Sequence, residues 1–324
     1  MDDRFLRYYK LILNYMKFQH FLITQFNLRN FWTTEVKDIE RWINWTKDRI
    51  KLFEKYCLPS VLNQRNQNFS WVIFMDRATP AKMVDELKAL SGNSSLIQWC
   101  FMDGYDDFKE NYLNIIRQKI NPNTKWIITT NLDNDDALHK DAIQSIQENF
   151  VPIQDHLISL ANGFCLDVRF NTLSQYYYPR SPFLSLIEKA DSDLKGIHHT
   201  SHTKWEKLKL HFIPEFIRRL RHKKNEHVTY ILNCPLWIQV VHGQNVSNSF
   251  YRGIPVRKKI NLEWFGISQI SNQMGLESIL KYRNYYLWKR YIYCSILRLL
   301  RPPNHRSTIE VYSEPDSPSD RTPE

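Results

Sequence analysis

The first 150 residues alternate between short apolar runs and stretches with helical spacing of apolar residues. A strand is expected where about four to eight apolar or β-branched residues stand together, and a helix where apolar residues recur every three or four positions. Short connections between alternating strands and helices favour a parallel sheet with helices on both faces. We therefore expect an α/β fold with a mainly parallel central sheet. The predicted strands are His20–Phe26, Phe69–Met75, Leu96–Phe101 and Trp126–Thr130, and the predicted helices are Glu35–Tyr56, Ala81–Leu90 and Asp107–Ile120.

The second half of the chain has a less regular pattern, and its end changes in composition. After Pro302 the sequence is rich in Ser, Pro, Glu and Asp, which is typical of a disordered tail. The predicted strands are His156–Val168 and Val228–Val241, and the predicted helices are Phe183–Ala190, Lys204–His222 and Gly275–Arg301. The predicted organisation is an N-terminal helix (1–19), two halves of one α/β domain (20–150 and 151–270), a basic C-terminal helix (271–301) and a disordered tail (302–324).

Three acids follow the fourth predicted strand, within the four residues from Asp133 to Asp136. Ligands of parallel sheets bind beyond the carboxyl ends of the strands, and Asp76 and Asp103 stand at two other predicted strand ends. Crowded carboxylates repel one another unless they share a cation, and hard oxygen ligands favour Mg²⁺ or Mn²⁺ together with substrate phosphates. The pattern predicts a divalent-cation site that holds a nucleoside diphosphate. The alternative is an acidic turn that caps a helix beginning near Ala137, because Asp is a good N-cap.

Composition narrows the classes of function. The chain has 324 residues, of which 43% are hydrophobic, as in a folded globular protein. Its eight glycines form no glycine-rich phosphate loop, so a bound nucleotide would depend on a metal for charge neutralisation. The five cysteines are scattered and are expected to be reduced. The first twenty residues do not resemble a signal peptide, and no apolar run has membrane-spanning length. We therefore expect a cytoplasmic protein.

The net charge of +10 suits an anionic partner such as nucleic acid, anionic lipid or polyphosphate. The predicted helix Gly275–Arg301 carries an apolar face opposite a basic face. Such a helix can lie on the inner face of a cell membrane. The alternative is a helix that packs on the rest of the protein and exposes its basic face to water.

An ordered set of segments within residues 20–250 points to one family. The segments are Thr24–Asn27, Trp71–Asp76 with Thr79-Pro80, Leu132–His139, Ser181–Glu188 and Trp237–Asn245. Together with the acidic cluster, they resemble the bacterial rhamnosyltransferase family of GT-A glycosyltransferases. The resemblance implies metal-dependent transfer of a sugar, with L-rhamnose as one candidate, from a nucleoside diphosphate donor to a saccharide or lipid-linked saccharide. Gln25 departs from the pattern, where an arginine is expected, and the segment after residue 270 has no counterpart.

The resemblance also implies roles on the donor side. Asn27 and Asp76 would bind the nucleotide, with the Asp76 carboxylate meeting the base, and Arg117 would close over the phosphates as a fixed positive charge. Asp133 would contact the ribose or the metal. The alternatives are an ordinary turn residue for Asp76 and a solvated helix arginine for Arg117.

The metal is expected to be Mn²⁺ or Mg²⁺, with Asp135 as its principal ligand and Asp136 in support. A histidine late in the chain would complete the set. His242, before Gly243, is the preferred candidate by resemblance, and His202 in the run from His198 is the alternative.

An inverting transferase also needs a general base for the acceptor hydroxyl. Glu188 and Asp191 follow the Ser-Pro-Phe segment on the expected acceptor side, and Asp167 is a third option. Two other functions remain open at this point. One is a metal-dependent nucleotidyl or phosphoryl transferase, and the other is a basic nucleic-acid-binding protein, which leaves the acidic cluster unexplained.

Overall fold

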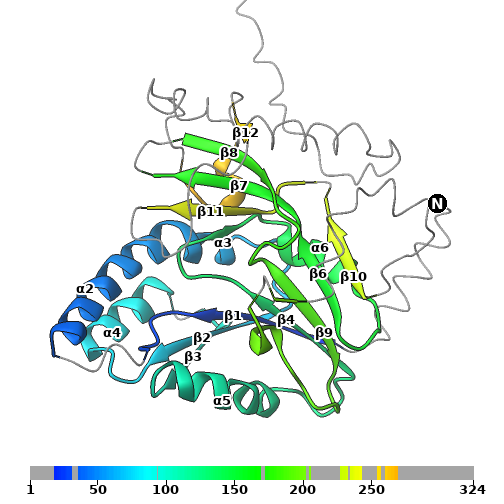
Figure 1. Ribbon diagram of the computed structural model, residues 1–324, viewed down its shortest axis with the longest axis horizontal. Helices are drawn as coiled ribbons and strands as arrows, with labels where there is room; N and C mark the ends of the chain where they lie inside the picture. Colours follow the sequence, from blue (N-terminus) through cyan, green and yellow to red (C-terminus); the bar gives the residue numbers. More distant parts are fainter. Residues whose placement is uncertain are drawn as a thin grey trace, which may run out of the picture.

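The computed structural model describes residues 18–30, 36–92, 94–168, 172–201, 204–205, 227–232, 234–242, 254–256 and 260–268. These residues form two β-sheets with helices packed against them (Figure 1). Several predictions lie outside the described residues: residues 1–17 of the N-terminal helix, most of the helix at Lys204–His222, His202, the basic C-terminal helix and the tail. Residues 18 and 19 of the predicted N-terminal helix already belong to the first strand.

The first sheet confirms the predicted parallel arrangement of the four N-terminal strands. Its order is β10-β6-β9-β4-β1-β2-β3, in which β3, β2, β1 and β4 are mutually parallel. The carboxyl ends of these four strands therefore meet at one edge of the sheet. The strand bounds are β1 Phe18–Gln25, β2 Ser70–Asp76, β3 Ile97–Met102, β4 Trp126–Asn131, β6 His156–Leu160, β9 Leu184–Lys189 and β10 Val228–Ile231.

Helices cover both faces of the parallel strands because successive strand residues point to opposite sides. Leu22 packs in a cluster with residues of α2, α4 and α6, whereas its neighbour Ile23 packs in a cluster with residues of α5. Figure 1 shows α5 on one side of the sheet and α2 with α4 on the other. The helices are α2 Val36–Leu52, α3 Leu58–Leu62, α4 Ala81–Leu90, α5 Gly104–Gln118 and α6 Ala142–Glu148.

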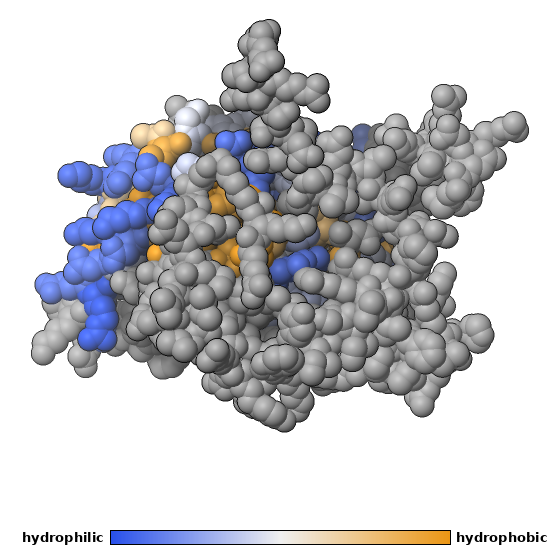
Figure 2. All heavy atoms as spheres, turned by 90° about the horizontal axis from the view of Figure 1, so that it is seen from above, coloured by the Kyte–Doolittle hydropathy of each residue, from blue (hydrophilic) through white to orange (hydrophobic). Residues whose placement is uncertain are grey.

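The second sheet has the order β12-β8-β7-β11-β5 and stacks above α3 in Figure 1. Strands β7 and β11 are parallel, and the other three pairs are antiparallel. Figure 2 shows the molecule from above. Hydrophobic residues of the described chain are visible near the middle of this view, with hydrophilic residues beside them. The strand bounds are β5 Ala137–Leu138, β7 Asn162–Asp167, β8 Thr172–Tyr177, β11 Trp237–Val241 and β12 Ile254–Pro255.

Three predictions for the second half were wrong. The helix predicted at Phe183–Ala190 is the strand β9, which pairs with β4 and β6 and packs Leu186 and Ile187 into clusters on opposite faces of the sheet. Such a short apolar run has no periodicity that distinguishes a strand from a buried helix. The long strand at His156–Val168 is divided at Ala161 into β6 and β7, and the one at Val228–Val241 is divided into β10 and β11. In both cases the chain passes from the first sheet to the second at the break.

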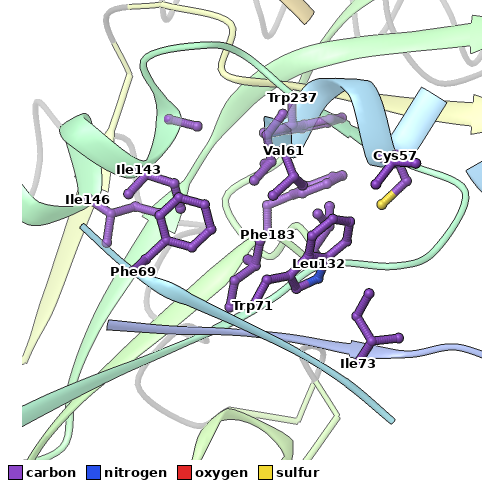
Figure 3. Packing of buried hydrophobic residues seen from close by; sticks show 14 of the residues in the cluster. Cys57, Val61, Phe69, Trp71, Ile73, Leu132, Ile143, Ile146, Phe183 and Trp237 are labelled. Atoms are coloured by element: carbon purple, nitrogen blue, oxygen red, sulfur yellow. The ribbon is translucent and has the colours of Figure 1, made fainter. Parts of the chain in front are cut away.

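The two sheets share a core, part of which is shown in Figure 3. Trp237 of β11 stacks on Phe183 with ring centroids 4.6 Å apart, and its indole N–H donates to the Leu160 carbonyl at 2.6 Å. Gly163 of β7 makes room for this ring, since a Cβ at that position would lie 2.1 Å from a Trp237 ring atom. In the part of the chain that the structure describes, no helix has both the length and the apolar character needed to cross a membrane.

Candidate active site

The acidic cluster lies in one of the turns that connect the two sheets. Asp133 to Asp136 follow β4 of the first sheet and lead directly into β5 of the second. The helix cap considered as an alternative is wrong, because the next helix after the cluster, α6, begins at Ala142. Instead, the Asp136 carboxylate accepts a hydrogen bond from the backbone N–H of Val240 in β11 at 2.9 Å. The turn is therefore built to bring β11 and its end to the carboxyl edge of the parallel strands.

Asp135 lies at the centre of the cluster and is 6% exposed. Its Oδ2 atom is 2.9 Å from Nε2 of His242, the residue that follows β11. The same oxygen accepts a hydrogen bond from Nη1 of Arg49. Burial alone would raise the pKa of Asp135, but the hydrogen bond from His242 and the charge of Arg49 outweigh it, so the pKa is lowered. Asp135 is therefore an ionised carboxylate at neutral pH.

Arg49 was not predicted from the sequence as a site residue. It belongs to the last turn of α2, is 6% exposed, and its guanidinium lies 4.8 Å from the centre of the Trp45 ring. Nη1 also donates to Oδ1 of Asn134 at 3.3 Å, whereas Nε is buried without a partner. The sequence held one signal, namely a basic residue in the apolar stripe of α2 that contains Trp42 and Ile50. A buried arginine is normally paired, and the structure identifies its partner as Asp135.

The other two acids of the cluster have different surroundings. Asp133 is accessible to solvent, yet desolvation by the surrounding protein and the charge of Asp135 raise its pKa to about 6. Asp136 is buried, and burial with the charges of Asp135 and Asp133 raises its pKa well above the ordinary value. The thiol of Cys57 donates to the Asp133 carbonyl oxygen at 3.6 Å, and burial followed by the three acids raises the pKa of this thiol. Cys57 ends a π-helical turn, a feature often found at functional sites.

The fit of this cluster to a divalent cation is partial. Among the described residues, no three His, Cys, Asp or Glu side chains are arranged as a metal site. The carboxylate of Asp135 and the imidazole of His242 do converge, and Asp136 is directed to β11. Mg²⁺ and Mn²⁺ commonly use one or two protein ligands and take the rest from water and substrate phosphates. Asp135 and His242 suit such a set, although Arg49 already lies at the same carboxylate oxygen.

Asp76 and Asn27 form a second polar group at the same edge of the sheet. The Asp76 carboxylate is fully buried and accepts hydrogen bonds from the backbone N–H and Nε of Arg29, at 3.0 and 2.9 Å, and from the N–H of Ala78. Asn27 donates to Thr79 at 2.9 Å and accepts from the backbone N–H of Asp76. Asp76 therefore holds the loop after β1, and the partly exposed Arg29 side chain is the part of this group that reaches solvent.

Gly104 allows the same loop to approach α5. Its φ of +87° is a left-handed conformation that favours glycine, and a Cβ there would lie 3.0 Å from the carbonyl oxygen of Arg29. The N–H of Tyr105 donates to that oxygen at 2.8 Å. Asp103, the other predicted strand-end acid, is exposed and pairs with Arg77. The ends of β1, β2 and β3 are thus linked through backbone and side-chain contacts.

The structure places three predicted site residues far from the acidic cluster. Arg117 lies in the last turn of α5, at the amino edge of the sheet, and donates to Asp193 at 3.2 Å on the surface. Glu188 of β9 is opposite Ile127 near the start of β4. At about 3.3 Å per residue, this is about 20 Å from Asp133. Asp191 follows the same strand and is exposed.

Glu188 forms hydrogen bonds with a segment of the chain other than the acidic cluster. Its two carboxylate oxygens accept hydrogen bonds from the backbone N–H groups of Lys195 and Gly196, at 2.7 and 3.0 Å. Burial raises its pKa, although these two hydrogen bonds oppose the shift. The carboxylate therefore fixes the segment after β9 and does not face the cluster of Asp135. The sequence could not show this, because the antiparallel direction of β9 decides at which edge Glu188 lies.

Two further candidates lie nearer to the carboxyl edge. Asp167 ends β7 and is paired in register with Val241, the residue before His242. His198 of the short 3₁₀ helix Ile197–His199 accepts a hydrogen bond at Nδ1 from the Gln25 side chain at the end of β1, at 3.0 Å. It packs against the rings of Phe108 and Tyr112. Burial lowers the pKa of His198 to about 4, so it is neutral at pH 7.

Comparison with known proteins gave one family and distant structural likenesses. A chain described as a "putative nucleotide-diphospho-sugar transferase" from Desulfovibrio desulfuricans G20 is 8% identical, with a TM-score of 0.29, over 69% of this chain and 79% of that chain. The S. aureus protein TarS, residues 1–349, is 10% identical, with a TM-score of 0.34, over 69% of this chain and 60% of that chain. A search of curated proteins gave no match. The model of a protein family matches residues 40–253, well over half of the chain. This chain therefore belongs to the family described as "Putative rhamnosyl transferase".

Proposed function

We propose that this glycosyltransferase transfers a sugar from a nucleoside diphosphate donor with the help of a divalent cation, Mn²⁺ or Mg²⁺, held by Asp135 and His242. The observation that carries the proposal is the 2.9 Å contact between Asp135 Oδ2 and His242 Nε2. It joins the end of the fourth parallel strand to the end of β11, at the edge where α/β sheets bind their ligands. The family description makes L-rhamnose the first sugar to test and a saccharide the first class of acceptor.

We assign a separate role to each polar residue at the carboxyl edge of the parallel strands. Asp135 and His242 hold the cation, whose positive charge stabilises the leaving diphosphate when it is bound. Asp133 lies beside them, accessible to solvent, and is proposed to meet the ribose or the cation. Arg29 and Asp76 are paired at the end of β2, and we propose that they form the part of the site that binds the nucleoside.

The general base is proposed to be Asp167 rather than Glu188 or Asp191. The strand register brings Asp167 next to Val241, one residue before His242, whereas Glu188 lies at the start of β4. A base has to reach the acceptor oxygen through at most one water molecule. Among the three acids named from the sequence, only Asp167 ends a strand adjacent to the proposed cation site.

Thermal unfolding with a panel of nucleotides tests the proposal. The wild-type protein is heated with UDP, dTDP or GDP, each with and without Mn²⁺. The expected result is a rise in Tm with one diphosphate that depends on Mn²⁺ and is lost in Asp135→Asn. The control is Asp103→Asn, an exposed acid at the same edge, which should keep the rise. A Tm that no nucleotide changes, together with salt-sensitive binding of single-stranded DNA or RNA, would contradict the proposal.

A further inference from the structure

A positive charge of the protein already occupies the carboxylate that the proposed function assigns to the metal. Arg49 Nη1 and His242 Nε2 both approach the same atom, Oδ2 of Asp135. The side chains of all three residues are at most 9% exposed. Water therefore screens the charges in this contact much less than it would at the surface.

Two cations cannot share this oxygen without strong repulsion. A divalent ion that binds Oδ2 lies about 2.0–2.3 Å from it, which is the space that the donor nitrogens now fill. The interaction of two like charges a few ångströms apart in a partly buried site is several times stronger than in bulk water. Metal loading of Asp135 through this oxygen therefore requires the Arg49 guanidinium to move away.

Arg49 has the contacts that such a movement needs. Nη1 already reaches Oδ1 of Asn134 at 3.3 Å, so one hydrogen bond is available when Asp135 is released. Trp45, one turn earlier in α2, offers its ring face at 4.8 Å and can keep the guanidinium in place by a cation–π contact. The buried Nε has no partner in the present arrangement, so a small rotation does not break a hydrogen bond there. The guanidinium stays charged at every accessible pH.

We propose that Arg49 is an internal cation that competes with the divalent metal for Asp135, and that metal binding transfers its guanidinium from Asp135 to Asn134. The inference rests on the proposed function, because it assumes that Asp135 is the metal ligand. It adds a residue that sets the affinity for the metal. The wild-type protein alone then binds Mn²⁺ weakly.

Calorimetric titration with MnCl₂ alone, without nucleotide, tests the competition. Arg49→Met removes the charge and keeps the length of the side chain, and it is expected to lower the Kd for Mn²⁺ by about tenfold or more. Arg49→Lys keeps the charge and is expected to stay within about threefold of wild type. The double variant Arg49→Met, Asp135→Asn should lose the gain, which places the bound ion at Asp135. Folded Arg49→Met protein that binds Mn²⁺ no tighter than wild type would overturn the proposal.

A measurement on the wild-type protein keeps the proposal testable if Arg49→Met does not fold. Arginine-selective ¹⁵N labelling gives one Nε–H signal for each arginine, and the signal of Arg49 is the one missing from Arg49→Lys. Titration with diamagnetic Mg²⁺ is expected to shift this signal as the guanidinium leaves Asp135. A signal that stays in place at saturating Mg²⁺ contradicts the inference.

The two proposals fail in different ways. If neither wild type nor Arg49→Met binds Mn²⁺, Arg49 is not what restrains the metal, and the inference fails. In that case, a rise in Tm with a nucleoside diphosphate alone would keep the donor assignment of the proposed function and reject its divalent cation. If metal binds as expected but no nucleotide does, the competition is supported and the donor assignment fails.

Discussion

Asp135 and His242 are 107 residues apart in the sequence, yet Oδ2 of Asp135 and Nε2 of His242 lie 2.9 Å apart. One belongs to the turn after the fourth parallel strand and the other follows β11 of the second sheet. Their contact exists only because β5 and β11 pair, with Ile238 opposite Ala137. The proposed donor site is therefore a property of the junction between the two sheets. A change that loosens this junction should weaken ligand binding as well as stability.

Gly163→Ala tests how tightly the junction is packed. A Cβ at this position would lie 2.1–2.5 Å from three atoms of the Trp237 ring, at the start of β11. Such overpacking is expected to lower the free energy of unfolding by about 3 kcal/mol. The matched control is Gly92→Ala, which has a φ of +59° and no atom within 4 Å of the added Cβ, and should cost only about 1–2 kcal/mol. Urea denaturation compares the two, and equal costs would contradict the described packing.

Asp76→Ala separates a structural role from direct contact with the nucleotide. The buried carboxylate accepts hydrogen bonds from the backbone N–H and Nε of Arg29 and from the N–H of Ala78, so its removal takes the partner from three donors that hold the loop after β1. The free energy of unfolding should fall by about 3 kcal/mol. Arg29→Ala, whose side chain is 30% exposed, should cost about 1 kcal/mol or less. If Asp76→Ala keeps its stability in urea and loses only nucleotide affinity, the carboxylate meets the base directly, as the sequence resemblance implied.

Asp167→Asn and Asp191→Asn distinguish the two edges of the sheet as the place of the general base. The unidentified acceptor can be replaced by water, so the rate of release of nucleoside diphosphate from a nucleotide sugar is the measured quantity. Loss of a general base commonly lowers a rate by about 100-fold or more. Asp167→Asn is expected to show this loss with unchanged affinity for the diphosphate, and Asp191→Asn to keep the wild-type rate. The reverse result would identify Asp191, in the segment after β9, as the general base.

The stability of the protein should fall in mild acid partly because of His20. Its imidazole is buried against Thr130 and Gln147, and burial lowers its pKa from 6.5 to about 3. Below about pH 6.5 the imidazole of His20 binds a proton in the unfolded chain but stays neutral in the folded chain. The free energy of unfolding therefore drops as the pH falls towards 3. The contribution is up to about 1.4 kcal/mol per pH unit. His20→Gln should flatten this dependence in urea denaturation between pH 6.5 and 4. Equal slopes for wild type and His20→Gln would contradict the burial of a neutral His20.

The parallel half of the fold could be predicted because each of its elements carries its own signal. β2 is an apolar run buried on both faces, α4 has clear helical spacing, and the acids fall where strands end. The second half could be predicted only in part, because the breaks between its strands are defined by pairing. β9 is a strand because β4 and β6 flank it, and its six residues contain nothing that excludes a helix. The passage at Ala161 from one sheet to the other also depends on partners that lie far away in the sequence.

The candidate site, too, could be predicted only in part from the sequence. Asp135 and His242 were named from the sequence, and the structure brings them together. The structure places Arg117 and Glu188 away from the acidic cluster, which the sequence could not show, because sequence spacing does not reveal whether a residue lies at the start or the end of a strand or helix. Arg49 was missed because its partner is 86 residues away and α2 had to be placed against the turn first.

The most direct test of the account is calorimetric binding of the nucleoside diphosphate, chosen from the thermal panel, in the presence of Mn²⁺. The monophosphate of the same nucleoside serves as the second ligand, since it lacks the phosphate that the cation would bridge. Wild type is expected to bind the diphosphate at least about tenfold more tightly than the monophosphate, and Asp135→Asn to lose this preference while Asp103→Asn keeps it. An Asp135→Asn protein that remains folded and binds the diphosphate as tightly as wild type would contradict the assignment of this cluster as the donor site.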